Sequence, residues 1–170
     1  MPQIPVKGIV VHSMAEYVKT PDGIYRASDF LRKIGLSVHG FIHPNGEYEM
    51  MLRSPNKAHH AGVSKWGPWS HLNNHFLGIE VLVPGIHDWS SFKAAINNVE
   101  KSPYTKAQME MTAHVVGYWM YYYLIPHDNI VRHSDCAGDH VRGAGKGKID
   151  PGPAFDWEWL QKRLKKDVCL

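Results

Sequence analysis

The chain has 170 residues, of which 44% are hydrophobic, so it is long enough to bury one substantial core and matches the usual size of a single domain. Lys and Arg outnumber Asp and Glu by only 19 to 16 and are spread along the chain, so no nucleic-acid partner is expected. Only two cysteines are present, and Cys169 is the penultimate residue, which argues against a fold built on disulfides.

Neither secretion nor membrane insertion is expected. Residues 1–7 lack the basic region, the apolar core and the small-residue cleavage site of a signal peptide, so we expect a cytoplasmic protein. The longest apolar run, from Val115 to Ile125, is too short to span a bilayer. Because no internal repeat or linker is evident, we predict one domain over residues 1–170.

The hydrophobic pattern predicts strands and helices interspersed along the chain. Ser28 is expected to cap the first helix, and Gly35 to end it. Asn45-Gly46 lies between two strand-like runs and is typical of a hairpin, so these runs should be antiparallel neighbours. The predicted strands are residues 7–12, 38–43, 47–52 and 76–83, the last ended by Pro84-Gly85, and the predicted helices are residues 29–34, 89–99, 105–125 and 157–165.

This order of elements favours an α/β fold with a central mixed sheet flanked by helices. The helix over residues 105–125 is expected to cross the back of the sheet and to form much of the core. Residues 54–74 are rich in Pro, Gly, His, Asn and Trp, which is typical of a long irregular surface segment that carries function.

Three residues far apart in the sequence have the side chains of a metal site. His12 ends the first apolar strand, and His133 is followed, after a Gly-rich stretch, by Asp150 in the run Asp-Pro-Gly-Pro. Two imidazoles and one carboxylate suit zinc, which keeps a fourth position for water in catalytic sites. The residues alone leave an alternative open, because such a histidine is often structural and such a run is often a turn.

Five blocks together resemble the type 2 N-acetylmuramoyl-L-alanine amidases. This family includes phage lysozyme-type amidases, bacterial wall and recycling amidases, and animal peptidoglycan recognition proteins. The blocks follow the family's order and extend from about Val6 to Leu164, so the resemblance covers nearly the whole chain. They are IVVHS at residues 9–13, HAG at 60–62, LGIE at 77–80, HSD at 133–135 and KIDPGPAFDW at 148–157.

The resemblance implies a zinc ion held by His12, His133 and Asp150 at one edge of a surface groove. It also implies hydrolysis of the amide bond between N-acetylmuramic acid and L-alanine in peptidoglycan or muropeptides. Glu80 matches the family's acidic residue beside the metal and is expected to act as general base and then acid. Lys148 lies two residues before Asp150, so in an extended segment its ammonium can face the metal and stabilise the oxyanion.

Four further residues are predicted to bind substrate. His39 and His60 match family positions and are expected to line the groove. Trp66 and Trp69 could equally stack on the substrate or pack their loop onto the domain. Cys136 does not match the position of the cysteine ligand of some phage members and is assigned no ligand role.

Other departures from the family pattern concern the rim of the groove. Some relatives carry a tyrosine where this chain has Val38, so no tyrosine hydroxyl is assumed to assist. His59 stands where an aromatic residue is often found. The Gly-rich connection, which spans residues 138–147, looks longer than in compact relatives and is expected to form a mobile rim that tunes substrate choice.

The resemblance leaves the biological role open. We favour a phage or prophage endolysin, which is made in the cytoplasm and acts on the cell wall; the alternative is a cytosolic amidase that recycles anhydromuropeptides. A binding module without catalysis is disfavoured, because His12, His133 and Asp150 are all suitable zinc ligands. We expect a monomer, without stable membrane insertion and without a separate wall-binding domain in residues 1–170.

Overall fold

The computed structural model describes residues 2–167 and contains one large mixed sheet. Its strands follow the order β2-β1-β7-β3-β4, and β8 pairs with the free side of the first half of β1. The pairs β1·β7, β3·β7 and β1·β8 are parallel, whereas β1·β2 and β3·β4 are antiparallel. The bounds are β1 Gly8–Thr20, β2 Gly23–Arg26, β3 Gly40–Ile42, β4 Tyr48–Met50, β7 Phe76–His87 and β8 Ile130–Arg132.

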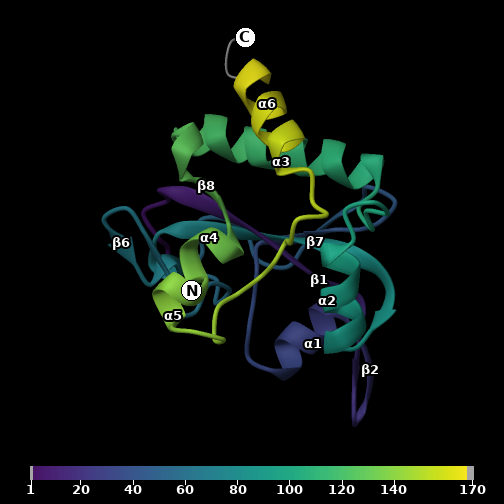
Figure 1. Ribbon diagram of the computed structural model, residues 1–170. Coiled ribbons are helices and arrows are strands. Elements are labelled where there is room, and N and C mark those ends of the chain that lie inside the picture. The colour runs from purple at the N-terminus through teal and green to yellow at the C-terminus, as the bar shows by residue number, and fades with distance from the viewer. Residues whose placement is uncertain (1, 168–170) are drawn as a thin grey trace.

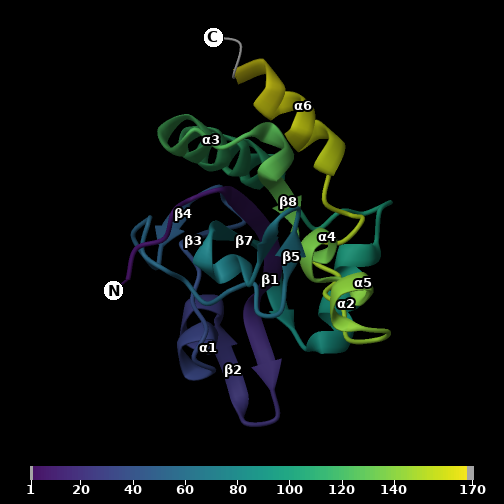
Figure 2. The same cartoon turned by 90° about the vertical axis from the view of Figure 1, so that its left-hand side faces the viewer.

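Helices cover both sides of this sheet. Helix α3 lies between the sheet and α6 in both views, and α1 lies on the opposite side (Figures 1 and 2). None of the helices in residues 2–167 combines the length and apolar character that crossing a membrane requires. The helices are α1 Ala27–Lys33, α2 Trp89–Asn97, α3 Lys106–Tyr123, α4 His133–Ala137, α5 Asp139–Arg142 and α6 Trp157–Asp167, with 3-10 turns η1 Leu72–Asn74 and η2 His127–Asn129.

The main core lies between the sheet and α3. Side chains alternate between the two faces along a strand. On one face, Ile9 and Val11 of β1 and Leu77 and Ile79 of β7 are fully buried in the same apolar cluster as Val116 of α3. The predicted mixed sheet is thus confirmed, as is the role of the helix predicted over residues 105–125.

The opposite face of the sheet carries two smaller apolar clusters with a polar gap between them. Val10 and Phe76 belong to a cluster beneath the loops, which here means the segment that runs from Ala61 to Leu72. Leu82 belongs to another cluster that packs beneath α1. His12 and Glu80 occupy the positions between them on β1 and β7. The fold therefore leaves a strip of this face where neither apolar cluster covers the central strands.

The central strands are longer than the sequence pattern predicts. β1 continues past His12 to Thr20 and forms a hairpin with β2, where burial becomes partial and the apolar run no longer marks the strand. Pro84-Gly85 does not end β7. The β1·β7 register shifts beside these two residues, and such an irregularity tolerates a proline because no ladder hydrogen bond is needed from it.

Two further predictions fail locally. Ser28 is not an N-cap; α1 begins at Ala27, Arg26 occupies the cap position, and Ser28 is buried inside the helix. The chain enters α1 directly from β2, so the end of the strand determines where the helix begins. The segment predicted to be irregular contains η1 and a small hairpin formed by β5, Lys65–Trp66, and β6, Trp69–Ser70.

Thr105 and Gln108 form a capping box that stabilises the start of α3. The Thr105 side chain accepts a hydrogen bond from the Gln108 backbone N–H at 3.1 Å, and the Gln108 side chain accepts one from the Thr105 N–H. The Thr105 hydroxyl also donates to the Pro44 carbonyl at 2.7 Å. Thr105→Ala should therefore lower the free energy of unfolding by about 1–2 kcal/mol.

Urea unfolding measures this loss, with Thr105→Ser as the matched control because it keeps the hydroxyl. The serine variant should retain most of the stability. Equal unfolding free energies for the alanine and serine variants would contradict the cap.

Candidate functional site

The site is organised around two residues that face each other across parallel strands. His12 of β1 and Glu80 of β7 are direct partners in the sheet register, and their exposed fractions are 1% and 8%. Paired residues of neighbouring strands project to the same face. The register thus places an imidazole and a carboxyl group in the strip between the two apolar clusters.

A second histidine reaches the same place from β8. Val11 pairs with Arg132 in the parallel β1·β8 register, so His133, the next residue, lies level with His12. Their ring centroids are 4.2 Å apart. Asp135 accepts a hydrogen bond from the Arg132 backbone N–H at 3.1 Å and also binds its guanidinium, which fixes the start of α4 at His133.

Asp150 completes a buried group of three possible ligands. Its Oδ2 lies 3.0 Å from His133 Nδ1 and 3.5 Å from His12 Nδ1. Its backbone carbonyl accepts a hydrogen bond from the Ser134 N–H at 3.0 Å, which holds the segment against α4. One ligand atom from each of the three side chains lies within 4.8 Å of the others, so this donor cluster could hold a metal ion.

The electrostatics of the donor cluster favour a cation. Burial, with His133 beside it, lowers the pKa of His12 to about 4, so its imidazole is neutral at pH 7. Burial acts to raise the pKa of Asp150, but the two neighbouring histidines outweigh it and hold that pKa below its ordinary value. A buried carboxylate beside a neutral imidazole offers electron pairs to a metal ion.

Glu80 and Lys148 carry charge next to this cluster. Glu80 Oε2 is buried and finds no hydrogen-bond partner among residues 2–167. Burial, helped by the negative charge of Asp150, raises the pKa of Glu80 well above its ordinary value, and the positive charge of Lys148 opposes this shift. The Lys148 side chain is exposed, and its backbone N–H donates to the Ala137 carbonyl at 2.9 Å.

His60 contacts the donor cluster directly. Its Nδ1 lies 2.8 Å from His12 Nε2, and its Nε2 lies 3.1 Å from the Phe76 carbonyl oxygen. The Asn73 side-chain oxygen accepts hydrogen bonds from the backbone N–H groups of His60 and Ala61, at 2.9 and 2.7 Å, and so holds this turn of the loop. Burial lowers the pKa of His60 well below its ordinary value, which keeps the ring neutral.

His39 is buried next to β3, and its ring contacts backbone groups. Its exposed fraction is 0%, its Nε2 donates to the Asn56 carbonyl at 2.9 Å, and its Nδ1 accepts from the Gly78 N–H at 3.0 Å. Backbone groups thus occupy both ring nitrogens. These contacts account for His39 as a residue that satisfies buried backbone groups, and substrate binding by His39 stays a prediction.

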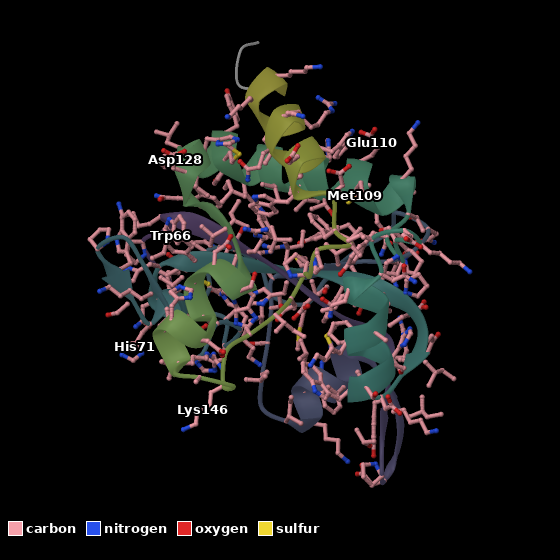
Figure 3. All side chains as sticks on the ribbon, viewed as in Figure 1. Trp66, His71, Met109, Glu110, Asp128 and Lys146 are labelled. Carbon is pink, nitrogen blue, oxygen red and sulfur yellow. The ribbon has the colours of Figure 1, made fainter. Side chains whose placement is uncertain are left out.

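Trp66 and Trp69 pack against the cluster beneath the loops. Trp66 Nε1 donates to the Asp128 carbonyl at 3.1 Å. Trp66 and Asp128 lie on the same side of the molecule in Figure 3. The Trp69 ring contacts Phe76 at a centroid distance of 5.8 Å. These contacts account for both tryptophans as packing residues, and substrate binding by them stays a prediction.

The Gly-rich segment over residues 138–147 is partly helical and is attached to the loop that carries His60. Arg142 of α5 donates to the carbonyl groups of Ala61 and Val63, each at 2.9 Å. Asp139 accepts hydrogen bonds from the N–H groups of Gly145 and Gly147. The expected mobile rim therefore contains a short helix that holds two parts of the site together, and Lys146 beyond it points outward (Figure 3).

The sequence did not indicate the residues that hold together the segments carrying the donor cluster. The Tyr104 hydroxyl lies 2.8 Å from Ser13 Oγ and 2.6 Å from the Pro151 carbonyl oxygen, so it links β1 to the Asp150 segment. Tyr104, like Asn73 and Arg142, lies outside any periodic pattern, and no sequence signal identified it.

Cys136 is separate from the donor cluster. Its Sγ lies 3.5 Å from the His133 carbonyl oxygen, and burial raises the pKa of its thiol to about 12. The group of possible ligands found in residues 2–167 does not include it. Cys169 lies outside the described residues.

A family model described as N-acetylmuramoyl-L-alanine amidase matches residues 2–153, which is most of the chain. The chain belongs to the type 2 N-acetylmuramoyl-L-alanine amidases. The chain is 32% identical over 131 residues to a relative, the 1,6-anhydro-N-acetylmuramyl-L-alanine amidase AmpD of Enterobacter cloacae. These residues make up 77% of this chain and 58% of AmpD, so the chain spans less than two thirds of that relative.

Two solved structures show the same amidase fold. AmpDh3 of Pseudomonas aeruginosa, in complex with anhydromuramic pentapeptide, has a TM-score of 0.65 at 22% identity, over 95% of this chain and 61% of AmpDh3. The endolysin amidase LysCS of Clostridium intestinale has a TM-score of 0.64 at 21% identity, over 97% of this chain and 89% of LysCS. At these identities the likeness concerns the fold.

Proposed function

We propose that the chain is a zinc-dependent amidase that hydrolyses the bond between N-acetylmuramic acid and L-alanine in soluble 1,6-anhydro muropeptides. The observation that carries this proposal is the buried donor cluster of His12, His133 and Asp150, with Glu80 beside it, whose Oε2 has no hydrogen-bond partner within residues 2–167. An endolysin is the role predicted from the sequence. The curated relative, named a 1,6-anhydro-N-acetylmuramyl-L-alanine amidase, supports the recycling alternative better.

The donor cluster fits zinc in chemistry and in spacing. Zinc takes imidazole nitrogen and carboxylate oxygen at about 2.0–2.1 Å, so a tetrahedral site separates its donor atoms by about 3.3 Å. The separations from Asp150 Oδ2 to the Nδ1 atoms of His133 and His12 are 3.0 and 3.5 Å. When bound, zinc lowers the pKa of water and polarises a carbonyl group.

The residues of the chain supply the proton transfers and the oxyanion contact. In the proposed reaction, Glu80 takes a proton from the attacking water as the new C–O bond forms at the lactyl carbonyl carbon. Glu80 then delivers that proton to the nitrogen of L-alanine as the C–N bond breaks, which leaves a carboxylic acid and an amine; the proton of the acid then passes to the amine or to solvent, so that a carboxylate is released. A raised pKa suits a group that must first accept and then donate a proton.

Lys148 is proposed to stabilise the negative charge on the carbonyl oxygen during this addition. Its ammonium belongs to the segment that ends in Asp150, and it already acts electrostatically on His12 and Glu80. A fixed positive charge beside a developing oxyanion lowers the barrier more than the same charge in bulk water.

A comparison of two substrates tests the function. The protein is incubated with soluble 1,6-anhydro muropeptides and with purified sacculi, with and without chelator, and the new ends are identified by mass spectrometry. We expect lactyl carboxyl and L-alanine amino ends from the soluble substrate, lost with chelator and restored by zinc. Faster release from sacculi would favour the endolysin role instead. Glycan cleavage or activity without metal would contradict an amidase of this class.

Glu80→Gln keeps the shape of the side chain and removes its proton transfer. We expect kcat to fall by about 10²–10⁴-fold while zinc stoichiometry stays unchanged. Glu47→Gln in the exposed hairpin turn is the matched control and should leave kcat unaltered. Full turnover by the Glu80 variant would remove Glu80 from the mechanism.

Two lysines of one loop allow the oxyanion role to be isolated. Lys148→Gln should lower kcat by about 10²–10³-fold, because the positive charge at the site is lost. Lys146→Gln removes the same charge two residues away, from a side chain that points outward (Figure 3), and should change kcat less than twofold. Equal losses in the two variants would argue for a general effect of charge instead of a contact in the site.

A further inference from the structure

The hydrogen bonds of His60 form a chain with one fixed end. The Phe76 carbonyl oxygen, 3.1 Å from His60 Nε2, can only accept a hydrogen bond. A neutral imidazole carries one ring proton, so the His60 proton is on Nε2 and its Nδ1 is an acceptor. The partner of that Nδ1 is His12 Nε2 at 2.8 Å, which must therefore carry the His12 proton.

We infer that His60 is a positioning residue that sets the tautomer of His12. With the His12 proton held on Nε2, its Nδ1 keeps a free electron pair that faces Asp150 Oδ2 in the donor cluster. The inference rests on the proposed metal site and goes beyond it, because it assigns His60 to the metal ligand. Substrate binding by His60 stays a separate prediction.

The competing tautomer is disfavoured by the distances. If His12 instead carried its proton on Nδ1, it would donate to Asp150 Oδ2 across 3.5 Å, a long contact for a hydrogen bond. His60 would then have to donate from Nδ1, and its bare Nε2 would face the Phe76 carbonyl oxygen at 3.1 Å. These two acceptors would be opposed at 3.1 Å, whereas the favoured tautomer opposes His12 Nδ1 and Asp150 Oδ2 only at 3.5 Å, so the competing tautomer loses the shorter hydrogen bond and gains the closer repulsion.

The fold holds the His60 ring in this orientation by packing as well. A Cβ added to Gly78 would lie 2.6 Å from His60 Nδ1, so the ring occupies the space that a side chain on β7 would take. Gly78 in turn donates its N–H to His39, and Asn73 holds the backbone of the loop. The His60 ring is therefore confined between β7 and His12.

The first test observes the tautomers in the metal-free, folded wild-type protein. Two-bond nitrogen–proton correlation spectra of the ¹⁵N-histidine-labelled chain should show His12 and His60 both protonated on Nε2. A proton on Nδ1 of either residue would overturn the inference. This readout needs neither zinc nor substrate, so an inactive protein with these tautomers would contradict the proposed function alone.

The second test measures zinc affinity by competition with a chromophoric chelator. His60→Leu removes the acceptor and should weaken binding by about 10- to 100-fold, as loss of such outer partners does. His60→Gln can accept from His12 and donate to Phe76, so it should restore most of the affinity. His59→Leu, at the exposed neighbouring position, is the control and should bind like wild type. Unchanged affinity in folded His60→Leu, or equal losses in the Leu and Gln variants, would contradict the inference.

Discussion

The site depends on the register in which β1 pairs with its two parallel neighbours. That register opposes His12 to Glu80 and brings His133 level with His12. Because side chains alternate along a strand, a slip of one residue would turn His12 into the core beneath α3 and put an apolar residue in its place. The apolar residues on the α3 face of β1 and β7 thus fix the position of the polar residues on the other face.

The donor cluster is costly for the folded protein without a metal ion. A carboxylate and two imidazoles are removed from water together, and Glu80 Oε2 is buried without a hydrogen-bond partner among the residues that the structure describes. Contacts of the cluster with the rest of the fold offset this free-energy cost. They come from Tyr104, the start of α4 and His60. Ion binding would then add its own free energy to the stability of the fold.

Sequence patterns predicted the mixed sheet, the long helix and the three possible ligands, because each has a strong local signal or a block shared with the family. They missed β8, which has only three residues, and the continuation of β7 through Pro84, which depends on an irregularity in its pairing with β1. They did not indicate which groups the rings of His39 and His60 contact, since the same residue type serves backbone, ligand or substrate according to its neighbours. Such roles come from contacts between segments distant in sequence.

In the proposed site, two histidines and one aspartate bind zinc without sulfur. X-ray absorption at the zinc edge of the loaded protein measures this directly. We predict a coordination shell of light atoms only, nitrogen and oxygen at about 2.0–2.1 Å, with the outer scattering of two imidazole rings. A sulfur scatterer at about 2.3 Å would instead implicate a cysteine, and a zinc ion with fewer than two imidazoles would contradict the donor cluster of His12, His133 and Asp150.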